Sequence, residues 1–307
     1  MVTRRCLLLV IASVTVCSPQ LTETSSIITA PRVLAVQATP PETLPGSRVH
    51  LTALIAGADG RVPQWAFCRT RKPLAELEPV SRSCIDGEPG ANQDLGEQLE
   101  LDATVPPDGC QLFGPDVLAA KPGEPAARPV DADSTGGYFQ PVRVALADAV
   151  AFGGVRLSCG LTGVTSEQLT EFNRRFVPNR NPAIASVMIN GVDTAVATVR
   201  AGDRVTLELR WVECPSDEVA CDGAETYASF SLASRSVVSR REAMAAAFYA
   251  SAGRFSVERV GTAADDFTTG AQSVWAAPQT PGAVSLWFVL RDDRGGAGTT
   301  SATITVE

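Results

Sequence analysis

The chain has 307 residues and a mass of 32.2 kDa, which is long enough for two domains that each bury a hydrophobic core. Charged side chains make up 20% of the residues and the formal net charge is −8, so no basic field is present to attract a nucleic-acid backbone. Nucleic acid is therefore not an expected partner. Short runs of Val, Thr and Ser between turns of Gly and Pro predict an all-β protein.

The N-terminus predicts a secretory signal over residues 1–17. Two arginines provide a positive start, and residues 6–16 form an apolar run that is too short to span a bilayer as a permanent helix. The segment Val14–Cys17 resembles a bacterial lipobox, in which the acylated Cys17 becomes the first mature residue. Val16 departs from that pattern, which normally has Gly, Ala or Ser at this position.

A lipid on Cys17 implies a membrane partner and a place in the envelope of a Gram-negative bacterium. Ser18 at the following position is similar to the sorting signal of outer-membrane lipoproteins. Residues 18–29 are rich in Ser and Thr and predict a flexible tether. The sequence therefore predicts an exported outer-membrane lipoprotein. Ordinary signal cleavage after Cys17 is the alternative and would give a soluble secreted or periplasmic protein.

The first predicted domain covers residues 30–180 and is an irregular β-sandwich. Strands are predicted at residues 30–36, 47–53, 65–68, 138–146 and 155–161. Residues 69–97 and 114–137 lack apolar periodicity, so they predict long loops in which a binding site would be sought. Tyr138 and Phe139, at the end of the second loop, are candidate binding residues.

A short helix is predicted before the linker between the domains. Thr165 and Gln168 have the spacing of a capping box, and Leu169, Phe172 and Phe176 share one face of a helix. Residues 179–182 then predict the linker, with the boundary near residue 180.

The second predicted domain covers residues 181–307 and repeats a sequence pattern of the first. The pattern Gly-x-Arg-Val-x-Leu begins at Gly46 and again at Gly202, each time after an opening strand. Because this arrangement corresponds to the first two strands of an immunoglobulin-like fold, we expect two related sandwiches in tandem. At the end of the chain, alternating apolar residues at 284–290 and 302–306 flank an Asp- and Gly-rich turn and predict a β-hairpin.

Residues 281–307 resemble the closing strands of PKD-type and bacterial immunoglobulin-like modules. This resemblance also implies a strand at residues 241–250, where composition alone favours a helix. The wider layout is similar to lipoproteins of myxobacteria and related Gram-negative bacteria. The motifs that carry it are Trp65–Cys68, Gly109–Pro115, Gly136–Pro141 and Arg291–Gly296. The resemblance implies location and architecture and offers no catalytic residues.

Six cysteines follow Cys17, and an even number in an exported chain predicts disulfides. Cys214 and Cys221 are the simplest pair because they are close together in the second half. Among the four cysteines of the first half, the pairs that we expect are Cys68 with Cys84 and Cys110 with Cys159. The spacing contains no Cys-x-x-Cys motif, so a zinc site is not expected.

The remaining chemistry-bearing residues predict no enzyme and no cofactor. His50 is the sole histidine, lies at an outward-facing strand position and is accompanied by no Gly-x-Ser-x-Gly motif, so a catalytic triad is not expected. Asp292 and Asp293 are candidate calcium ligands, but a solvated turn is the favoured interpretation because Ca²⁺ needs six to eight oxygen ligands. Trp287 is a candidate for stacking on a sugar ring, whereas the other tryptophans are expected in the cores.

The sequence thus favours a non-enzymatic cell-envelope lipoprotein with a structural or protein-interaction role. Its expected partners are a membrane, through the lipid anchor, and other envelope proteins or surface glycans. The alternative is a carbohydrate- or peptide-binding accessory module that uses the long loops of the first domain.

Overall fold

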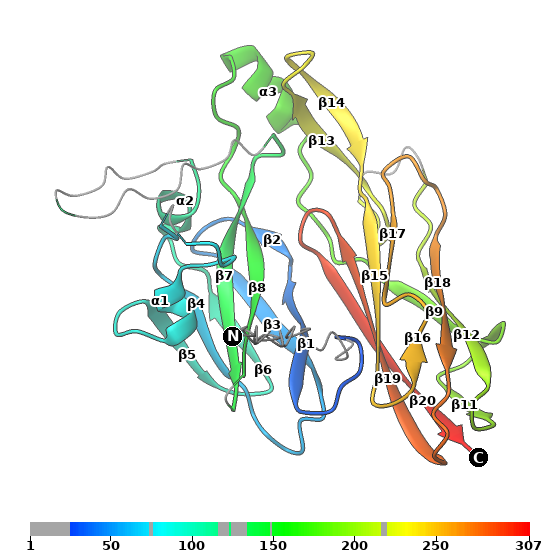
Figure 1. Ribbon diagram of the computed structural model, residues 1–307. Helices are drawn as coiled ribbons and strands as arrows, with labels where there is room; N and C mark the ends of the chain where they lie inside the picture. Colours follow the sequence, from blue (N-terminus) through cyan, green and yellow to red (C-terminus); the bar gives the residue numbers. More distant parts are fainter. Residues whose placement is uncertain (1–24, 74–75, 116–122, 124–133, 148, 216–219) are drawn as a thin grey trace, which may run out of the picture.

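The chain folds into β-strands that form two sandwiches, with short helices between some of the strands (Figure 1). The computed structural model describes residues 25–73, 76–115, 123, 134–147, 149–215 and 220–307. The predicted signal segment, Cys17 and most of the predicted tether lie outside these residues. Within the described part of the chain, no helix is long and apolar enough to cross a membrane.

The first sandwich pairs a three-stranded sheet of order β1-β3-β6 with a five-stranded sheet of order β2-β8-β7-β4-β5. Its elements are β1 (Arg32–Thr39), β2 (Glu42–Thr43), β3 (Arg48–Ala56), β4 (Gln64–Cys68), α1 (Arg82–Asp86), β5 (Asn92–Glu97), β6 (Glu100–Thr104), α2 (Gly109–Leu112), β7 (Gly137–Leu146) and β8 (Ala149–Ser158). Inward-facing apolar side chains fill the space between the two sheets. Fully buried examples are Leu51, Trp65, Phe67, Val142, Val144, Val155 and Leu157.

The second sandwich pairs two five-stranded sheets, of order β10-β9-β12-β18-β16 and β11-β20-β19-β15-β17. Its elements are β9 (Ile184–Ile189), β10 (Val192–Asp193), β11 (Val196–Val199), β12 (Arg204–Trp211), β13 (Thr226–Ser231), β14 (Ser236–Arg241), β15 (Met244–Ala250), β16 (Arg254–Phe255), β17 (Arg259–Thr262), β18 (Gly270–Ala276), β19 (Gly282–Asp292) and β20 (Ala297–Val306). Trp211, Trp275, Phe248 and Phe288 lie in its core, as expected of the two tryptophans.

Both sandwiches share the same arrangement of their early strands, which confirms the immunoglobulin-like fold class. In each, a short strand pairs in parallel with the last strand of the sandwich: β2 with β8, and β11 with β20. The Gly-x-Arg-Val-x-Leu pattern then starts β3 in one sandwich and β12 in the other. Gly46 and Gly202 have φ values of 82° and 78°, so the turn before each strand requires a residue that adopts the left-handed conformation.

Other sequence-based expectations are confirmed or corrected by the strands. Residues 244–250 form strand β15, as the resemblance implied, and β19 with β20 forms the closing hairpin. The loop predicted at residues 69–97 is instead partly ordered, because it contains helix α1 and strand β5. The Cys68–Cys84 disulfide and the pairing of β5 with β4 stabilise this segment, although its sequence lacks apolar periodicity. The boundary near residue 180 stays a prediction.

Helix α3 (Ser166–Arg175) lies where the sequence predicts it and projects from one end of the molecule beside the hairpin β13–β14 (Figure 1). Thr165 and Gln168 form the expected capping box. Leu161 and Phe172 pack against Ala228 and Phe230 of β13, so the segment that follows the first sandwich is fixed to the second.

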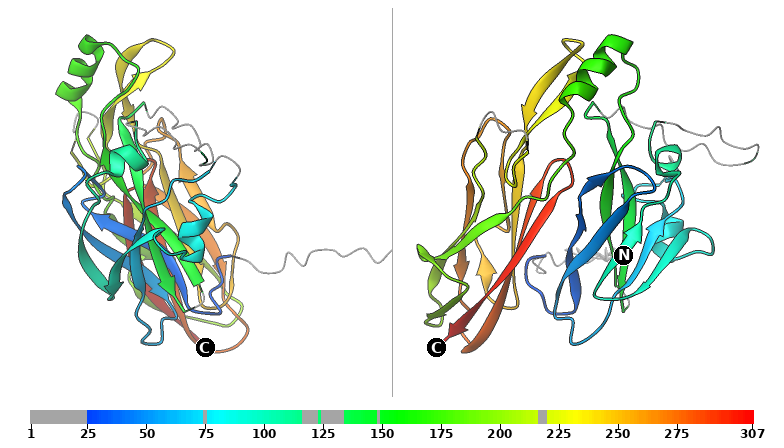
Figure 2. Two further views of the ribbon diagram at one scale, coloured as in Figure 1. Left: turned by 90° about the vertical axis from the view of Figure 1, so that its left-hand side faces the viewer. Right: turned by 180° about the vertical axis from the view of Figure 1, so that it is seen from behind.

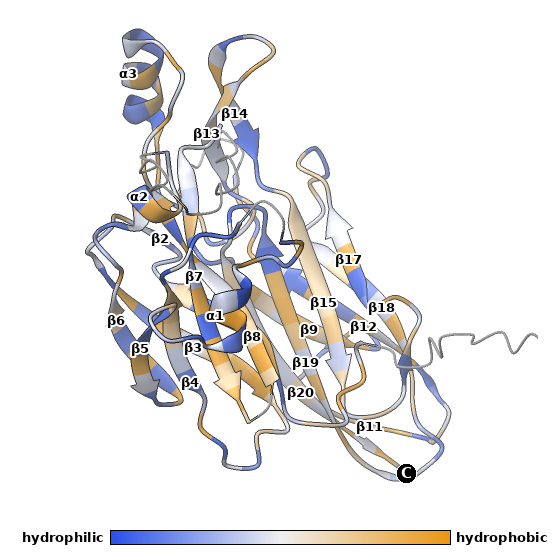
Figure 3. Cartoon of the chain, turned by 60° about the vertical axis from the view of Figure 1, so that its left-hand side comes forward, coloured by the Kyte–Doolittle hydropathy of each residue, from blue (hydrophilic) through white to orange (hydrophobic). Residues whose placement is uncertain are grey.

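The outer faces of two sheets pack against each other and hold the sandwiches side by side (Figure 2). The first sandwich contributes Leu34, Ala35 and Ala56, and the second contributes Ala247, Tyr249 and Val289. Figure 3 shows hydrophobic residues along β15 and β19, on the side of the second sandwich that makes this contact. We call this contact the sandwich interface. Burial of these side chains makes the two sandwiches one body.

Replacing Val289 by Asp should separate the sandwiches. Val289 is 0% exposed in the sandwich interface, so an unpaired carboxylate there should lower the free energy of unfolding by about 2–4 kcal/mol. We expect small-angle X-ray scattering to show a larger radius of gyration for V289D. The control is V196D, at a residue that is 67% exposed, which should scatter like the unmodified protein. Equal scattering by both variants would contradict the interface.

Candidate functional site

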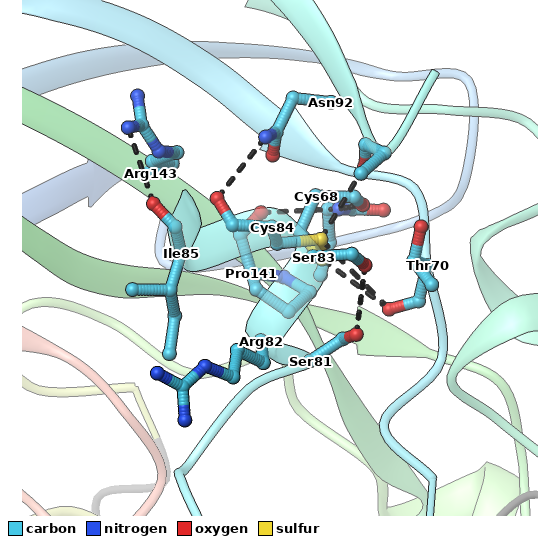
Figure 4. Close-up of a disulfide and its surroundings, with 12 residues drawn as sticks. Cys68, Thr70, Ser81, Arg82, Ser83, Cys84, Ile85, Asn92, Pro141 and Arg143 are labelled. Atoms are coloured by element: carbon cyan, nitrogen blue, oxygen red, sulfur yellow. Dashed lines mark hydrogen bonds between the residues drawn. A yellow bond between two sulfur atoms is a disulfide. The ribbon is translucent and has the colours of Figure 1, made fainter. Parts of the chain in front are cut away.

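The cysteines pair as the sequence suggests: Cys68 with Cys84, Cys110 with Cys159, and Cys214 with Cys221. Figure 4 shows the first of these bonds, between β4 and α1. Nearby, Asn92 Nδ2 donates to the Cys84 carbonyl at 3.1 Å and an Arg143 guanidinium nitrogen donates to the Ile85 carbonyl at 3.3 Å (Figure 4). The disulfide and these bonds attach α1 to the outer face of the five-stranded sheet.

The solvated turn expected at Asp292 is wrong. Asp292 is 8% exposed, and its Oδ1 accepts hydrogen bonds from the backbone N–H groups of Arg294 and Gly296, each at 2.8 Å. Its carboxylate also accepts from Asn179 Nδ2 at 3.3 Å. Asp293, by contrast, is exposed. The carboxylate of Asp292 is therefore engaged in shaping the β19–β20 turn. Among the described residues, no group of three or more His, Cys, Asp or Glu side chains is arranged to hold a metal ion.

The three candidate binding aromatics lie in different environments. Trp287 is half-buried at the edge of the sandwich interface, so its ring packs against protein and is not displayed for a sugar. Tyr138 is 6% exposed and shares the alternating positions of β7 with the buried Val142 and Val144. Phe139 is 42% exposed on the outer face of β7. Only Phe139 of the three is therefore presented to solvent.

A group of charged side chains is buried where the first sandwich, the linker and the β19–β20 turn meet. We call it the junction cluster; its members are Glu42, Arg156, Asn179, Glu225, Glu242, Asp292 and Arg294, each 8% exposed or less. They come from β2, β8, the linker, both sides of the β13–β14 hairpin and the β19–β20 turn. The cluster thus joins five separate segments of the chain.

Arg294 is the centre of the junction cluster. One of its terminal nitrogens lies 2.9 Å from Glu42 Oε2, and the other lies 2.9 Å from Glu225 Oε1 and 3.6 Å from Glu242 Oε1. Its guanidinium also lies 4.7 Å from the centre of the Tyr227 ring. Since Glu42 belongs to the first sandwich and Glu225 to the second, this single side chain binds both.

Glu42 is the counterpart of Arg294 in the first sandwich. Its Oε1 lies 3.2 Å from Arg156 Nε, and its Oε2 accepts a hydrogen bond from the Asn179 backbone N–H at 2.8 Å. The parallel pairing of β2 with β8 places Glu42 directly beside Arg156. The linker is therefore held by the same carboxylate that binds Arg294.

The junction cluster holds more acid than base. Four carboxyl groups, of Glu42, Glu225, Glu242 and Asp292, share two guanidinium groups. Burial raises the pKa of Glu225 to about 7, although Arg294 opposes the shift. Burial also raises the pKa of Glu242 well above its usual range, and the carboxylates of Asp292 and Glu225 raise it further. Protons on these two groups relieve the excess negative charge.

A cleft of about 370 Å³ lies next to the junction cluster, on the outer face of the first sandwich. Its walls are Phe113, Phe139, Pro141 and Val80, and Lys72 provides the charged group at its margin. We call it the Phe139 cleft. The lining combines aromatic and proline side chains with a few polar groups, which is the composition of many ligand sites.

Phe139 separates the cleft from the junction cluster. The Arg156 guanidinium lies 5.7 Å from the centre of its ring. A Cβ atom added to Gly295, which has a φ of 99°, would lie 2.5 Å from Phe139 Cε1. The β19–β20 turn of the second sandwich therefore supports an aromatic wall of a cleft in the first.

The geometry of the junction cluster does not offer an open acid pair. Glu225 and Glu242 are adjacent, since the Glu225 N–H donates to Glu242 Oε2 at 3.2 Å, but they are 1% and 0% exposed. Their carboxyl groups are thus closed to a substrate. His50 lies at the surface, as expected, where Nδ1 is 3.0 Å from Asp102 Oδ1.

Sequence reasoning missed the junction cluster apart from Asp292. Glu42 lies in the two-residue strand β2, and Glu225 and Glu242 lie next to the ends of the β13–β14 hairpin, where acidic residues normally face water. The one usable signal was the run of Asp and Arg residues between two strongly apolar strands, at 292–294. The run does form a turn, but the side chains of Asp292 and Arg294 point inward while Asp293 is exposed.

Two immunoglobulin-like sandwiches with three disulfides define a protein of an exported, oxidising compartment. No protein-family model matches the chain, and no curated protein matches it.

Among solved structures, the chain is similar to the fibronectin(III)-like modules of Clostridium thermocellum CbhA, with 10% identity, a TM-score of 0.23, and coverage of 89% of this chain and 94% of that one. It is also similar to the C-terminal domain of the Streptococcus pyogenes antigen I/II-family protein AspA, with 9% identity, a TM-score of 0.25, and coverage of 90% and 98%. A third similarity, to the human F-spondin reeler domain, has 12% identity and a TM-score of 0.25, with coverage of 42% of this chain and 93% of that one. At these values the similarities carry no conclusion about function.

The contribution of Glu225 to stability should fall as the pH rises. Its pKa is about 7 in the folded protein and 4.5 in the ordinary state, so the folded form holds the proton more tightly. The contribution is complete below about pH 4.5 and is lost as the pH rises through about 7.

The measurement is urea unfolding of the unmodified protein and of E225Q between pH 4.5 and 8. We expect the stability of E225Q to fall less over this range, because a neutral amide replaces the titrating group. The matched control is E171Q, at a residue of helix α3 whose side chain is 40% exposed, which should keep the original pH dependence. Parallel curves for E225Q and the unmodified protein would contradict the assignment.

Proposed function

We propose that the protein is a lipid-anchored component of the bacterial cell envelope with a structural or protein-interaction role and no catalytic activity. The observation that carries this proposal is the junction: the sandwich interface and the junction cluster join two scaffold domains into one body. The buried charged groups form ion pairs with one another across this junction, which supports a structural role for them. A rigid body of this kind holds or bridges partners without chemistry.

The location of the protein in the outer membrane is part of the same proposal. The three disulfides support export, and the sequence Val14–Cys17 followed by Ser18 supports acylation and outer-membrane sorting. In this location, the expected partners are other envelope proteins or surface glycans. A soluble secreted or periplasmic protein is the alternative.

The test of anchoring is the intact mass of the detergent-extracted native protein. We expect a mature chain that starts at Cys17 and carries the mass of a diacylglyceryl and an acyl group. Thiol alkylation should add six adducts after reduction and none before, because all six cysteines of the described chain are in disulfides. A chain that starts beyond Cys17 without lipid would contradict the anchor and leave a diffusible protein.

The Phe139 cleft favours a second candidate function, the binding of a carbohydrate or peptide by the first sandwich. Phe139 is exposed on a concave surface and has Lys72, Thr70 and Ser81 as polar neighbours. Aromatic and proline side chains suit the flat apolar face of a sugar or an extended peptide, and the polar groups supply hydrogen bonds. This function is compatible with the first, because a scaffold can carry a binding cleft.

Replacing Phe139 by Ala should abolish binding in the cleft. The measurement is saturation-transfer NMR with amino-sugar oligosaccharides and proline-containing peptides as probes. We expect any signal seen with the unmodified protein to disappear in F139A and to remain in F267A, a control at a phenylalanine that is 69% exposed elsewhere. Because Phe139 also contacts the β19–β20 turn, thermal unfolding of F139A checks that the variant is folded. Signals retained by a folded F139A would rule out the cleft.

A further inference from the structure

The first described residues form a strap that is fixed to the second sandwich. The N-terminal strap, Ser25–Ile28, runs beside the end of β15, where the Ile28 N–H donates to the Ala250 carbonyl at 2.8 Å and the Ala250 N–H donates to the Ser26 carbonyl at 2.9 Å. The Ser26 hydroxyl donates to Glu258 at 2.7 Å. The chain then continues into β1 of the first sandwich. The strap is therefore a fixed point at the seam between the sandwiches.

Few residues separate this fixed point from the predicted anchor. Only residues 18–24 lie between Cys17 and Ser25. Even fully extended, this stretch of chain reaches about 28 Å. In the proposed function, on which this inference rests, Cys17 carries lipid, so the strap lies within that distance of the bilayer surface.

The surroundings of the strap suit a lipid surface. A hollow of about 930 Å³ lies between the strap, the start of β8 and the turn after β15. Among the described residues of its lining, Arg32 is the one that is charged, and the others are small polar and apolar residues. Val150 of the first sandwich lines it and is 37% exposed. Val150 thus presents an exposed apolar side chain on this face, and none of the described residues that line the hollow is acidic.

We infer that the face formed by the strap and Val150 lies against the membrane, and that the Phe139 cleft and α3 point away from it. The hairpin β7–β8 connects the two regions. Phe139 pairs with Arg156 near one end of this hairpin, whereas Leu146 pairs with Ala149 at the other. Seven residues of strand separate Phe139 from Leu146, a distance of about 23 Å. Figure 1 shows α3 and the β13–β14 hairpin at the end of the molecule opposite the β7–β8 turn.

In this orientation the two ends of the molecule have different roles. The membrane end holds the tether and lets exposed apolar side chains meet the interfacial region of the bilayer, which is favourable for apolar groups. The opposite end carries the concave aromatic surface, where a partner can reach it. A short tether on a rigid body keeps the strap within about 28 Å of the bilayer, which favours this orientation.

The test is quenching of an added tryptophan by brominated lipids in vesicles that contain the full-length lipidated protein. Val150→Trp places the probe on the inferred membrane face. Leu232→Trp, at a 72% exposed residue of the β13–β14 hairpin, is the matched control on the opposite end. After subtraction of the emission of the unmodified protein, we expect a loss of fluorescence for V150W and none for L232W.

The outcomes separate this inference from the proposed function. Intact mass first establishes that each variant carries lipid; protein without lipid contradicts the anchor itself. Lipidated V150W that is quenched no more than L232W overturns the orientation while the anchor stands. Shielding of the V150W tryptophan from aqueous iodide in detergent, in proportion to protein concentration, would mean that a second copy covers this face and would also overturn it.

Discussion

The structure depends on one buried cation that is shared by two domains. Arg294 binds Glu42 of the first sandwich and Glu225 of the second, each at 2.9 Å, from a position that is 2% exposed. Removing a guanidinium from water is costly, and the cost is recovered only when several well-placed acceptors surround it. These acceptors come from both sandwiches and from the linker. The position of each sandwich is therefore coupled to the charge balance of the junction.

The junction cluster also fixes the relative position of the two sandwiches better than an apolar interface alone would. Apolar packing between β1, β15 and β19 is non-directional and tolerates sliding, whereas hydrogen-bonded charges require defined positions. Burial is the main reason why the pKa values of Glu225 and Glu242 rise, and the neighbouring carboxylates raise them further. Because the two sandwiches form one rigid body, a short tether limits the position of both. For the same reason the β19–β20 turn can support Phe139, a wall of the cleft in the first sandwich.

Local patterns predicted the fold well and the junction poorly. Alternation along β12 and β19, the capping box at Thr165, and the Cys214–Cys221 spacing depend on residues near in sequence, so these strands, α3 and this disulfide could be predicted. Cys110 and Cys159 are 49 residues apart, and local spacing does not determine their pairing. The junction cluster joins Glu42 to Arg294, which are 252 residues apart, and polar patterning does not show which charged residues meet. Phe139 was identified as a candidate from its place beside a long loop, but the cleft depends on helices and turns brought together by the fold. Asp292 was misjudged because Asp–Gly turns normally face water.

The most direct test of the central claim is the unfolding of R294M, followed by tryptophan fluorescence and near-ultraviolet circular dichroism in urea. Trp65 reports on the first sandwich and Trp211 and Trp275 on the second. We expect one transition for the unmodified protein and a loss of about 3–5 kcal/mol, with separated transitions, for R294M. The control R210M breaks an exposed ion pair and should leave the stability and the single transition nearly unchanged. Two independent transitions in the unmodified protein, or an R294M curve equal to that of R210M, would contradict the claim that Arg294 holds the two sandwiches as one body.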